Sequence, residues 1–392
     1  MKLLQTPGGR RFVCAAAGVA TVVAVTACAG PANGSDDSVK IGLLANLTGG
    51  ASTSFGIPFE QGFELALDEA KAQLDNAGVT VEVVTEDAKS AVPTAVTGYN
   101  KLRQEGVALV VQDSQSPLGQ AVAPLASEDG IALLSGAGSS LENPDGYAFR
   151  FTDLATPTAA VGTYLSAQGA ERIGVVVAGD NPSFATLAGA TEKGLPTGFA
   201  SRQEVSSQDS DFSAVLANLR RDRVDAVVLS VLPAQAGNLL LQASQSGGLD
   251  GVKLVGTLAT STETFTVAQD VARGFEFPQV WAPSISGDSD FQRRYTEQYG
   301  ETPTAYGALG YQVGWIAAAS IITADGAGTA DGASTVDGAA VRDALPAAST
   351  SDLVHEHGIL DLELASDGVA ISKGVMATFG PDGSVVATEP QE

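Results

Sequence analysis

The sequence predicts an α/β protein with two lobes, each built on a parallel sheet, and a hinge in which the chain crosses between the lobes three times. Two observations predict this fold. Short apolar runs alternate with helical patterns from Val39 to Ser135, and the alternation repeats from Arg172 to Thr257. Strand-helix-strand units of this kind form right-handed crossovers, and therefore a parallel sheet.

The first unit alternates four strand-like runs with three helical patterns. The longest helical pattern, Pro58–Ala77, places Phe59 and Phe63 on one apolar face. We therefore expect Phe59 to face the core, whereas Phe55 lies in the glycine-flanked loop before the helix and is out of step with that face. The strand-like runs are Val39–Ala45, Val79–Thr85, Val107–Gln112 and Ile131–Ser135. The other helical patterns are Val92–Glu105 and Leu118–Asp129.

The second unit repeats the pattern and has about the size of a small domain. Its strand-like runs are Arg172–Gly179, Phe199–Ser206, Val224–Val231 and Val252–Thr257. Its helical patterns are Pro157–Gln168, Phe184–Lys193, Asp211–Arg221 and Ala234–Ser246. Two similar α/β units therefore follow each other along the chain.

The region after the second unit has too few strands for a sheet of its own, so we expect it to complete both lobes. Its helical patterns are Asp288–Tyr299 and Thr304–Thr323, and its strand-like runs are Ile359–Leu364 and Gly374–Phe379. A low-complexity loop, Asp325–Gly338, interrupts it. Lobe 1 is expected to comprise 39–150 plus 284–355, and lobe 2 to comprise 151–278 plus 358–386. The expected crossings are Arg150–Asp153, Phe277–Ser284 and His355–Ile359, which make a hinge where a ligand can be enclosed.

The first 28 residues have the pattern of a secretory signal. A basic start is followed by a small apolar run, Phe12 to Ala27, and no acidic residue occurs before Asp36. The run ends in "VTACAG", which resembles the lipobox of bacterial lipoproteins and predicts that Cys28 is acylated after cleavage. The alternative is an ordinary signal peptide with an incidental cysteine. Residues 29–38, "AGPANGSDDS", are predicted to be a flexible tether.

The charge and cysteine content limit the possible partners and the source of stability. Asp and Glu number 45 against 21 Lys and Arg, which argues against binding nucleic acid or an anionic membrane through a basic surface. The chain has two cysteines; Cys14 would be removed with the signal and Cys28 would be lipidated. The mature chain then has no disulfide, so core packing must stabilise it.

Motifs for catalysis and for cofactors are scarce. There is neither a Gly-x-Ser-x-Gly elbow nor a phosphate loop ending in Gly-Lys-Ser/Thr. The segment "SGAGSSL" imitates a dinucleotide loop, but Leu141 occupies the third glycine position. His355 and His357 would share one face of a strand, yet further metal ligands are not evident nearby, so an exposed hinge segment is the better interpretation. We expect neither a cofactor nor a metal.

Three strand-to-helix turns in the first unit are rich in small hydroxyl residues. They are "LTGGASTSFGIPFEQG", "QDSQSPLG" and "SGAGSS". Ligands of open parallel sheets bind beyond the carboxyl ends of the strands, where these turns lie. Pro117 suits the first helical position and Ser116 the N-cap, so free backbone N–H groups with the Ser116 and Ser139 hydroxyls would cradle an anion or carboxylate. The alternative is that these serines only cap their own helices.

Several ordered segments carry a resemblance to a known family. "VKIGLLANLTGGASTSFGIPFEQGFELALDEA", "DGIALLSGAGSSLEN" and "DFSAVLANLRRDRVDAVVLSV" resemble the type 1 periplasmic binding proteins of the branched-chain amino acid (Leu/Ile/Val) family. The likeness runs from Val39 to the end of the chain. It implies two Rossmann-like lobes that close on a solute, and a role as the solute-binding component of an ABC importer.

The resemblance also implies positions for ligand contacts in the first lobe. The family's aromatic residue in the first loop matches Phe55, and its serine that binds the ligand carboxylate matches Ser116. Its small residue and hydroxyl after the fourth strand match Ala137 and Ser139. The first-lobe carboxylate cradle of the family is therefore expected here.

The second lobe departs from the family. One tyrosine matches Phe184, a second falls at Leu232 or Pro233, and the acid that pairs with an α-ammonium falls at Leu258. The nearest acids are Glu263 and Asp250, and Asp113 is a further source of charge if its side chain faces the cleft. An ammonium buried without a countercharge costs several kcal/mol. We therefore expect a small carboxylate or amino-acid-like solute with an apolar or aromatic tail, and a carboxylate fits better than a plain α-amino acid. A neutral amide is a further alternative.

The sequence thus predicts a monomeric, lipid-anchored solute-binding protein on the outer face of the bacterial membrane, which delivers its solute to an ABC permease and has no enzymatic activity. Two alternatives stay open. One is a ligand-sensing module for a membrane receptor or kinase. The other is an exported hydrolase, which would need His355 or His357 near a serine.

Overall fold

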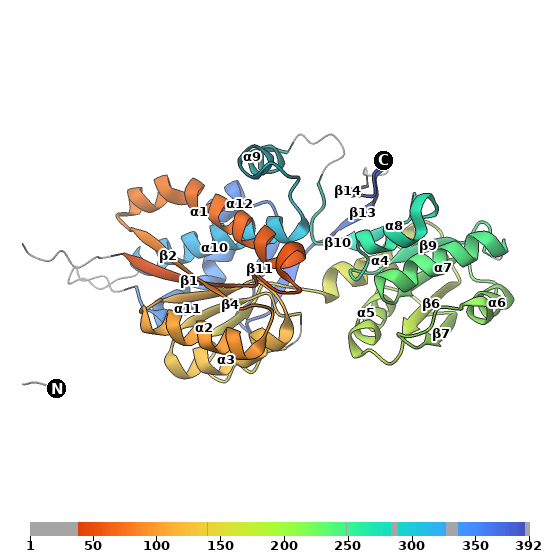
Figure 1. Cartoon of the computed structure of the whole chain (residues 1–392), viewed down its shortest axis with the longest axis horizontal. Coiled ribbons are helices and arrows are strands. Elements are labelled where there is room, and N and C mark those ends of the chain that lie inside the picture. The colour runs from red at the N-terminus through yellow and green to blue at the C-terminus, as the bar shows by residue number, and fades with distance from the viewer. Residues whose placement is uncertain (1–37, 139, 248, 284–288, 327–335, 389–392) are drawn as a thin grey trace, which may run out of the picture. The chain divides into compact units, whose positions relative to one another are not determined.

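Two parallel sheets, each with its own helices and core, build the fold (Figure 1). The computed structural model describes residues 38–138, 140–247, 249–283, 289–326 and 336–388. The first sheet has the strand order β2-β1-β3-β4-β5 and the second the order β7-β6-β8-β9. The predicted α/β fold with two parallel-sheet lobes is confirmed. The predicted signal segment, Cys28 and the predicted tether up to residue 37 lie outside the described residues.

The first lobe follows the predicted strand-helix alternation. Its strands are β1 (Val39–Ala45), β2 (Val81–Asp87), β3 (Leu109–Gln112), β4 (Ala132–Ser135) and β5 (Ala148–Arg150). Helices α1 (Ile57–Ala77), α2 (Val92–Gln104) and α3 (Ser116–Asp129) connect the first four. In β1, Ile41 and Leu43 enter one core and Leu44 the other, because successive side chains point to opposite faces. From Ile41 to Ala45 the strand is buried and has no polar side chain, because helices cover both faces of the sheet.

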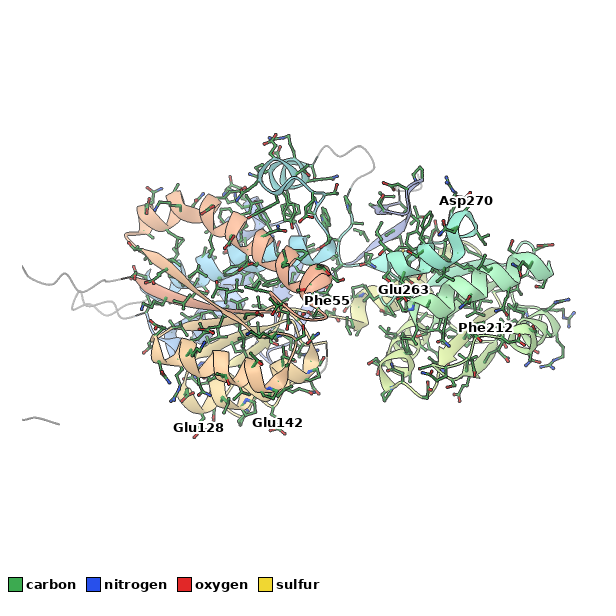
Figure 2. The ribbon with its side chains drawn as sticks, in the orientation of Figure 1. Phe55, Glu128, Glu142, Phe212, Glu263 and Asp270 are labelled. Carbon is green, nitrogen blue, oxygen red and sulfur yellow. The ribbon has the colours of Figure 1, made fainter. Side chains whose placement is uncertain are left out.

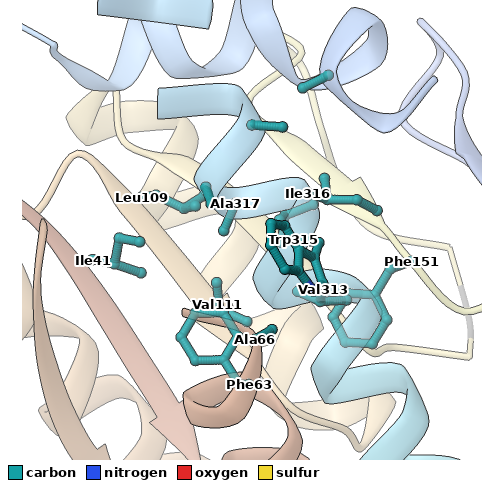
Figure 3. Packing of buried hydrophobic residues seen from close by; sticks show 14 of the residues in the cluster. Ile41, Phe63, Ala66, Leu109, Val111, Phe151, Val313, Trp315, Ile316 and Ala317 are labelled. Atoms are coloured by element: carbon teal, nitrogen blue, oxygen red, sulfur yellow. The ribbon is translucent and has the colours of Figure 1, made fainter. Parts of the chain in front are cut away.

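Helices from distant parts of the chain cover one face of the first sheet. The core on that face joins α1 with α10 (Ala305–Gly326) and α11 (Gly338–Ser349), whereas α2 and α3 pack on the other face. Figure 3 shows Phe63 of α1 and Val111 of β3 beside Trp315 of α10. The segment after the second lobe therefore completes the first, as predicted.

Helix α10 is the one helix among the described residues that is long and apolar enough to cross a membrane. Its apolar window has a mean hydropathy of 1.2, but 89% of that window is buried inside the protein. Trp315, Ile316 and Ile321 are at most 1% exposed. A helix that is apolar on all sides and packed on all sides is the central helix of a folded lobe.

Glycines allow α1 and α10 to pack at very close range. A Cβ on Gly62 would lie 1.9 Å from the carbonyl oxygen of Gly307, and one on Gly310 would lie 2.0 Å from that of Phe59. Side chains at either position would force the two helices apart. This close contact explains why the interiors of α1 and α10 contain glycine, although glycine costs a helix about 1 kcal/mol relative to alanine.

The second lobe repeats the design with four parallel strands. They are β6 (Ile173–Ala178), β7 (Ser201–Val205), β8 (Ala226–Ser230) and β9 (Lys253–Gly256). Its helices are α4 (Ala155–Ala167), α5 (Pro182–Lys193), α6 (Ser213–Arg221), α7 (Pro233–Ser246) and α8 (Thr262–Ala268), with a 3₁₀ turn at Gln269–Ala272. A small antiparallel sheet, β10-β13-β14, joins this core through Phe277 and Phe379. Its strands are β10 (Phe277–Gln279), β13 (Val375–Phe379) and β14 (Val385–Ala387).

The remaining elements differ from the expected lobe boundaries. The hairpin of β11 (Leu362–Leu364) and β12 (Ala370–Ser372) packs in the core of the first lobe, and Val369 bridges to Arg150 beside it. The chain therefore passes to the second core between Ser372 and β13, later than the expected crossing at His355–Ile359. That expected crossing is instead α12 (Asp352–His357), whose N-cap Ser351 accepts from the Val354 amide. Helix α9 (Asp290–Tyr299) precedes α10.

Candidate functional site

The site predicted in the first lobe lies at the carboxyl edge of its sheet. Strands β1, β3 and β4 are direct neighbours in the order β1-β3-β4, so the turns that follow them meet at one edge. These turns carry Phe55, Ser116 and Ala137, respectively. Ser139 lies outside the described residues.

Phe55 stands in a π-helical turn, Ser52–Gly56, that leads into α1. Figure 2 shows it where the ribbon of α1 begins. Its ring is half-buried and contacts Tyr306 of α10 edge to face, with 4.5 Å between the ring centres and 86° between the planes. Such an aromatic pair adds about 1 kcal/mol beyond the area that it buries.

Phe59 belongs to the core, as predicted. It is 0% exposed and stacks on Phe151, with ring centres 5.4 Å apart, and on Phe63, at 6.4 Å. The two phenylalanines at the start of α1 therefore have different environments, and only Phe55 is partly open to solvent.

Ser116 is half-buried and opens α3, so the expected N-cap position is wrong by one residue. Gln115 occupies the N-cap, with φ 69° and ψ 105°. A non-glycine residue in that conformation costs on the order of 1–3 kcal/mol, and such residues gather at ligand sites. The turn ends at Pro117, whose fixed φ suits the first helical turn.

Hydrogen bonds connect the ends of β3 and β4 and the turns that follow them. The Ser135 hydroxyl donates to Gln112 Oε1 at 2.6 Å, the Gln112 amide donates to the carbonyl of Ser114, and the Ala137 N–H donates to Ser135 Oγ at 3.2 Å. A Cβ on Gly138 would lie 3.8 Å from Ser116 Oγ. The structure thus brings Ser116 and the Ala137 turn together, with the Ala137 side chain fully buried.

Gly136 allows the closest approach in this edge. A Cβ there would lie 2.0 Å from the backbone carbonyl of Asp113, closer than any real contact. No other residue fits this position without moving one of the two turns.

A buried polar pair, Asn46 and Asp113, joins the turn after β1 to the turn after β3. Both side chains are 0% exposed. The Asn46 amide nitrogen donates to Asp113 Oδ1 at 2.9 Å and to Oδ2 at 3.0 Å, and the Asn46 backbone N–H donates to Oδ2 at 3.2 Å. Burial raises the pKa of Asp113 to about 6, although these hydrogen bonds oppose the shift. In this structure the carboxylate does not face solvent, so it is not a free countercharge for a ligand.

Tyr306 also lies beside these turns, which the sequence did not indicate. Besides its contact with Phe55, burial and then the negative charge of Asp113 raise the pKa of its phenol to about 12, so the phenol stays protonated at any physiological pH. In the sequence it begins an apolar helix pattern, and only the packing of α10 against α1 brings it to the edge.

The matching edge of the second sheet is apolar. Phe184, Leu232 and Leu258 follow β6, β8 and β9, which are neighbours in the order β6-β8-β9. Phe184 is 6% exposed, lies in the second core and accepts the Ser230 hydroxyl at its carbonyl, at 2.8 Å. Leu232, the N-cap of α7, and Leu258 are half-buried against the same core.

The acidic residues nearest to Leu258 have other surroundings. Glu263 is exposed in the first turn of α8, and Asp250 is exposed in the turn before β9. Thr257, the residue before Leu258, is 0% exposed, and no described group hydrogen-bonds its hydroxyl. The second edge thus offers buried hydroxyl and hydrocarbon groups beside Leu258.

The histidine pair lies on α12, not on a strand. His355 is exposed, and His357 stacks on Trp315 with ring centres 4.4 Å apart. A helix places residues two apart on different sides, so the expected shared face is wrong. Among the described residues, no group of three His, Cys, Asp or Glu side chains could hold a metal ion.

Two cavities lie away from the predicted residues. One of about 650 Å³ is lined by Arg103, Asp129 and Tyr147 at the amino edge of the first sheet. The other, of about 430 Å³, lies between Trp281, Arg294 and His357. Neither includes a residue from the turns after β1, β3 or β4.

The chain belongs to the periplasmic binding protein family. The sequence profile of that family, described as "Periplasmic binding protein", matches residues 38–383. This match covers both lobes and confirms the predicted family. No curated protein sequence matches the chain.

Solved structures with the same fold include three solute-binding proteins. The leucine-binding protein LivK from Thermotoga maritima has a TM-score of 0.66 at 22% identity, over 90% of this chain and 98% of its own. LivJ from Streptococcus pneumoniae, solved with isoleucine, also has a TM-score of 0.66 at 22% identity, over 90% of this chain and 100% of its own. A Rhodopseudomonas palustris protein solved with benzoate has a TM-score of 0.60 at 17% identity, over 89% and 95%. At these identities the likeness shows the fold.

Proposed function

We propose that the protein is an extracytoplasmic solute-binding lipoprotein of an ABC importer, anchored through Cys28, and that it binds a small carboxylate with an apolar or aromatic tail. The two lobes would close around the solute, since contacts from both edges are complete only in the closed state. The residues proposed to contact it are Phe55, Ser116, Ala137, Ser139, Phe184, Leu232 and Leu258, with Tyr306 added from the structure.

The observation that supports this ligand class is the contrast between the two edges. The first has helix starts and hydroxyls that suit a carboxylate, and an aromatic pair that suits an apolar tail. The second has Leu258 where the family resemblance expects an acid, so an α-ammonium group would lack its countercharge there. Solved proteins of this fold bind isoleucine or benzoate, and both ligands combine a carboxylate with an apolar tail.

The proposal is tested by thermal-shift screening of the chain from Ser35 onward with benzoate, aliphatic acids, amides and L-isoleucine. A ligand at 100 times its dissociation constant stabilises the native state by about 2.7 kcal/mol. We expect aromatic or aliphatic acids to give the largest shift. If L-isoleucine gives the largest shift, the interpretation of Leu258 is wrong.

Ser116→Ala tests the carboxylate cradle. Removing a hydrogen bond to a charged group costs about 1.5–3 kcal/mol, so the affinity for the best acid should fall about tenfold or more, as measured by calorimetry. Ser213→Ala, on an exposed helix start of the second lobe, is the matched control. Unchanged affinity in Ser116→Ala would remove Ser116 from the site.

A further inference from the structure

The Asn46–Asp113 pair consists of a buried carboxylate that is held by neutral donors. Besides the three bonds from Asn46, the Ser114 hydroxyl donates to Asp113 Oδ2 at 3.1 Å. None of the ion pairs within the described ranges includes Asp113. A carboxylate with no exposed surface and no cation is an expensive group to retain for stability alone.

The groups packed around Asp113 are also neutral at physiological pH. The turn after β1 contributes Asn46, the end of β3 and the turn after it contribute Gln112 and Ser114, and the turn after β4 contributes the backbone of Gly136. From α10, Tyr306 is the titratable group that feels its charge. Asp87, which holds the turn after β1 from the other side, accepts from the backbone amides of Leu47 and Thr48 at 3.1 and 3.2 Å, and no hydrogen bond within the described residues joins it to Asp113.

The pair connects the two turns that carry the proposed ligand contacts. Asn46 supports the Phe55 turn, because a Cβ on Gly56 would lie 2.1 Å from the Asn46 carbonyl oxygen. The Asn46 side-chain oxygen also accepts from the Ser90 amide at 2.8 Å. Asp113 precedes Ser116 by three residues in the other turn. The position of Phe55 relative to Ser116 therefore depends on this contact.

Protonation of Asp113 would disturb this arrangement. A carboxylic acid must direct its O–H at an acceptor, but the Asn46 nitrogens can only donate, and Asn46 Oδ1 is engaged by Ser90. Only the Ser114 hydroxyl, which can rotate, is able to accept among the bonded neighbours. The neutral acid therefore makes fewer or weaker bonds to the turn after β1 than the carboxylate does.

We propose that Asp113 and Asn46 are positioning residues whose contact, made by the ionised carboxylate, holds the Phe55 turn against the Ser116 turn and makes solute binding weaken on acidification. The contact between the two turns does not depend on the proposed function. Its effect on solute binding rests on the proposed function. Burial places the titration of Asp113 at a pKa of about 6, so the change is expected between pH 5 and 7.

Amide hydrogen exchange of the ligand-free, full-length chain tests the coupling without a solute. Between pH 7.5 and 5, protection factors in 47–57 and 114–119, corrected for intrinsic rates, should fall about fivefold to tenfold, the worth of about one hydrogen bond. In Asp113→Asn these segments should already be weakly protected at pH 7.5, with no further change. Asn46→Ala removes the two side-chain bonds to the carboxylate and keeps the one from the backbone N–H, so the midpoint should move to higher pH.

Asp129→Asn is the matched control, since Asp129 pairs with Arg103 at the opposite edge of the sheet. Its pH response should be that of the wild type. The unfolding temperature of Asp113→Asn at pH 7.5 should stay the same or rise, because a buried charge is removed. A pH response retained in Asp113→Asn, or a flat wild-type profile, would overturn the coupling. A loss of protection throughout the first lobe of Asp113→Asn would also overturn the proposed coupling of the two turns.

Calorimetry with benzoate as the probe tests the effect on binding. The dissociation constant of the wild type should rise about fivefold to tenfold from pH 7.5 to pH 5, while that of Asp113→Asn should not change over this range. A pH-independent wild-type affinity would refute the effect on binding. If benzoate binds at no pH, the proposed ligand class fails for this probe, and the exchange experiment still decides whether Asp113 couples the turns.

Discussion

The carboxyl edges of the two sheets have the same topology but opposite chemistry. In the first, a hydrogen-bonded network of Asn46, Asp113 and Ser135 fixes the turns, and a strained residue, Gln115, lies in one of them. In the second, the corresponding places hold Phe184, Leu232 and Leu258, which pack on the core. Two lobes with the same fold can therefore have different roles in binding a solute. The polar edge can orient the solute, while the apolar edge supplies the area that contacts it.

The largest effect expected from this comparison concerns Phe184 at the second edge and Phe55 at the first. Phe184→Ala should lower the free energy of unfolding by about 3–5 kcal/mol, because it leaves a cavity in the second core. Phe55→Ala removes a half-buried ring and should cost stability far less, while weakening ligand affinity about tenfold. Chemical denaturation and calorimetry on both variants measure the two quantities. Equal losses of stability would contradict the difference in burial between the core ring of Phe184 and the half-buried ring of Phe55.

A pair of glycines tests how tightly each edge is packed. Gly136 and Gly179 are each the first residue after a strand, but a Cβ on Gly136 meets a backbone oxygen at 2.0 Å, whereas one on Gly179 meets the Glu204 side chain at 3.4 Å. Gly136→Ala should cost about 3 kcal/mol through overpacking. Gly179→Ala should change stability by no more than about 0.5 kcal/mol. Similar denaturation midpoints for the two variants would show that the turns of the first edge can move to accommodate the added methyl group.

The smallest effect is a pH dependence of opposite sign at the two edges. Burial, then Glu64 and Asp87, raise the pKa of Glu60 to about 7, so the native state holds a proton there that the unfolded state releases above about pH 4.5. Ionised Glu60 therefore costs stability, increasingly from pH 4.5 to 7. Glu60→Gln should be more stable than wild type above pH 7, by about 1 kcal/mol after allowance for its partial exposure, and equal to it below pH 4.5.

Asp180, at the second edge, is the comparison for Glu60. Hydrogen bonds from Ser207 and Ser206 lower the pKa of its carboxyl, so its contribution is present above the unfolded pKa and is lost as the pH falls through the native value. Asp180→Asn should therefore be less stable than wild type at neutral pH and match it in acid. Thermal unfolding across pH measures both variants, and a gain in stability for Asp180→Asn at neutral pH would contradict the assignment.

The sequence predicted most of the long elements, but it missed the 12-residue helix α11 and most of the shortest strands. β1 was predicted with both of its ends, because its residues from Ile41 to Ala45 form a run without polar side chains, as in a buried parallel strand. The strands β5, β10, β12 and β14 have three residues each, too few to show a period, and they were missed. Helix α12 was also missed. Ser351 before Asp352 is an N-cap signal, but the neighbouring segment His355–Ile359 was predicted to be a hinge crossing.

The sequence indicated the sheet edge only where its turns follow a strand directly. Ser116 and Ala137 were proposed as ligand contacts because their turns come straight after buried strands, and the structure places both turns at that edge. Asn46 and Asp113 also follow strands, but their contact spans 67 residues and leaves no local pattern. Tyr306 is brought to the edge by α10, which returns from beyond the second lobe, and no spacing in the sequence encodes that return.

The close packing of α1 against α10 sets an order on folding. The core around Phe63 and Ile41 lacks its central helix until residue 326 of 392 has been synthesised. Before that point the nascent chain cannot bury this face of the first sheet. Contacts so far apart along the chain also slow the collapse afterwards. The contact that Gly62 and Gly310 allow between the two helices therefore forms only after most of the chain has been made.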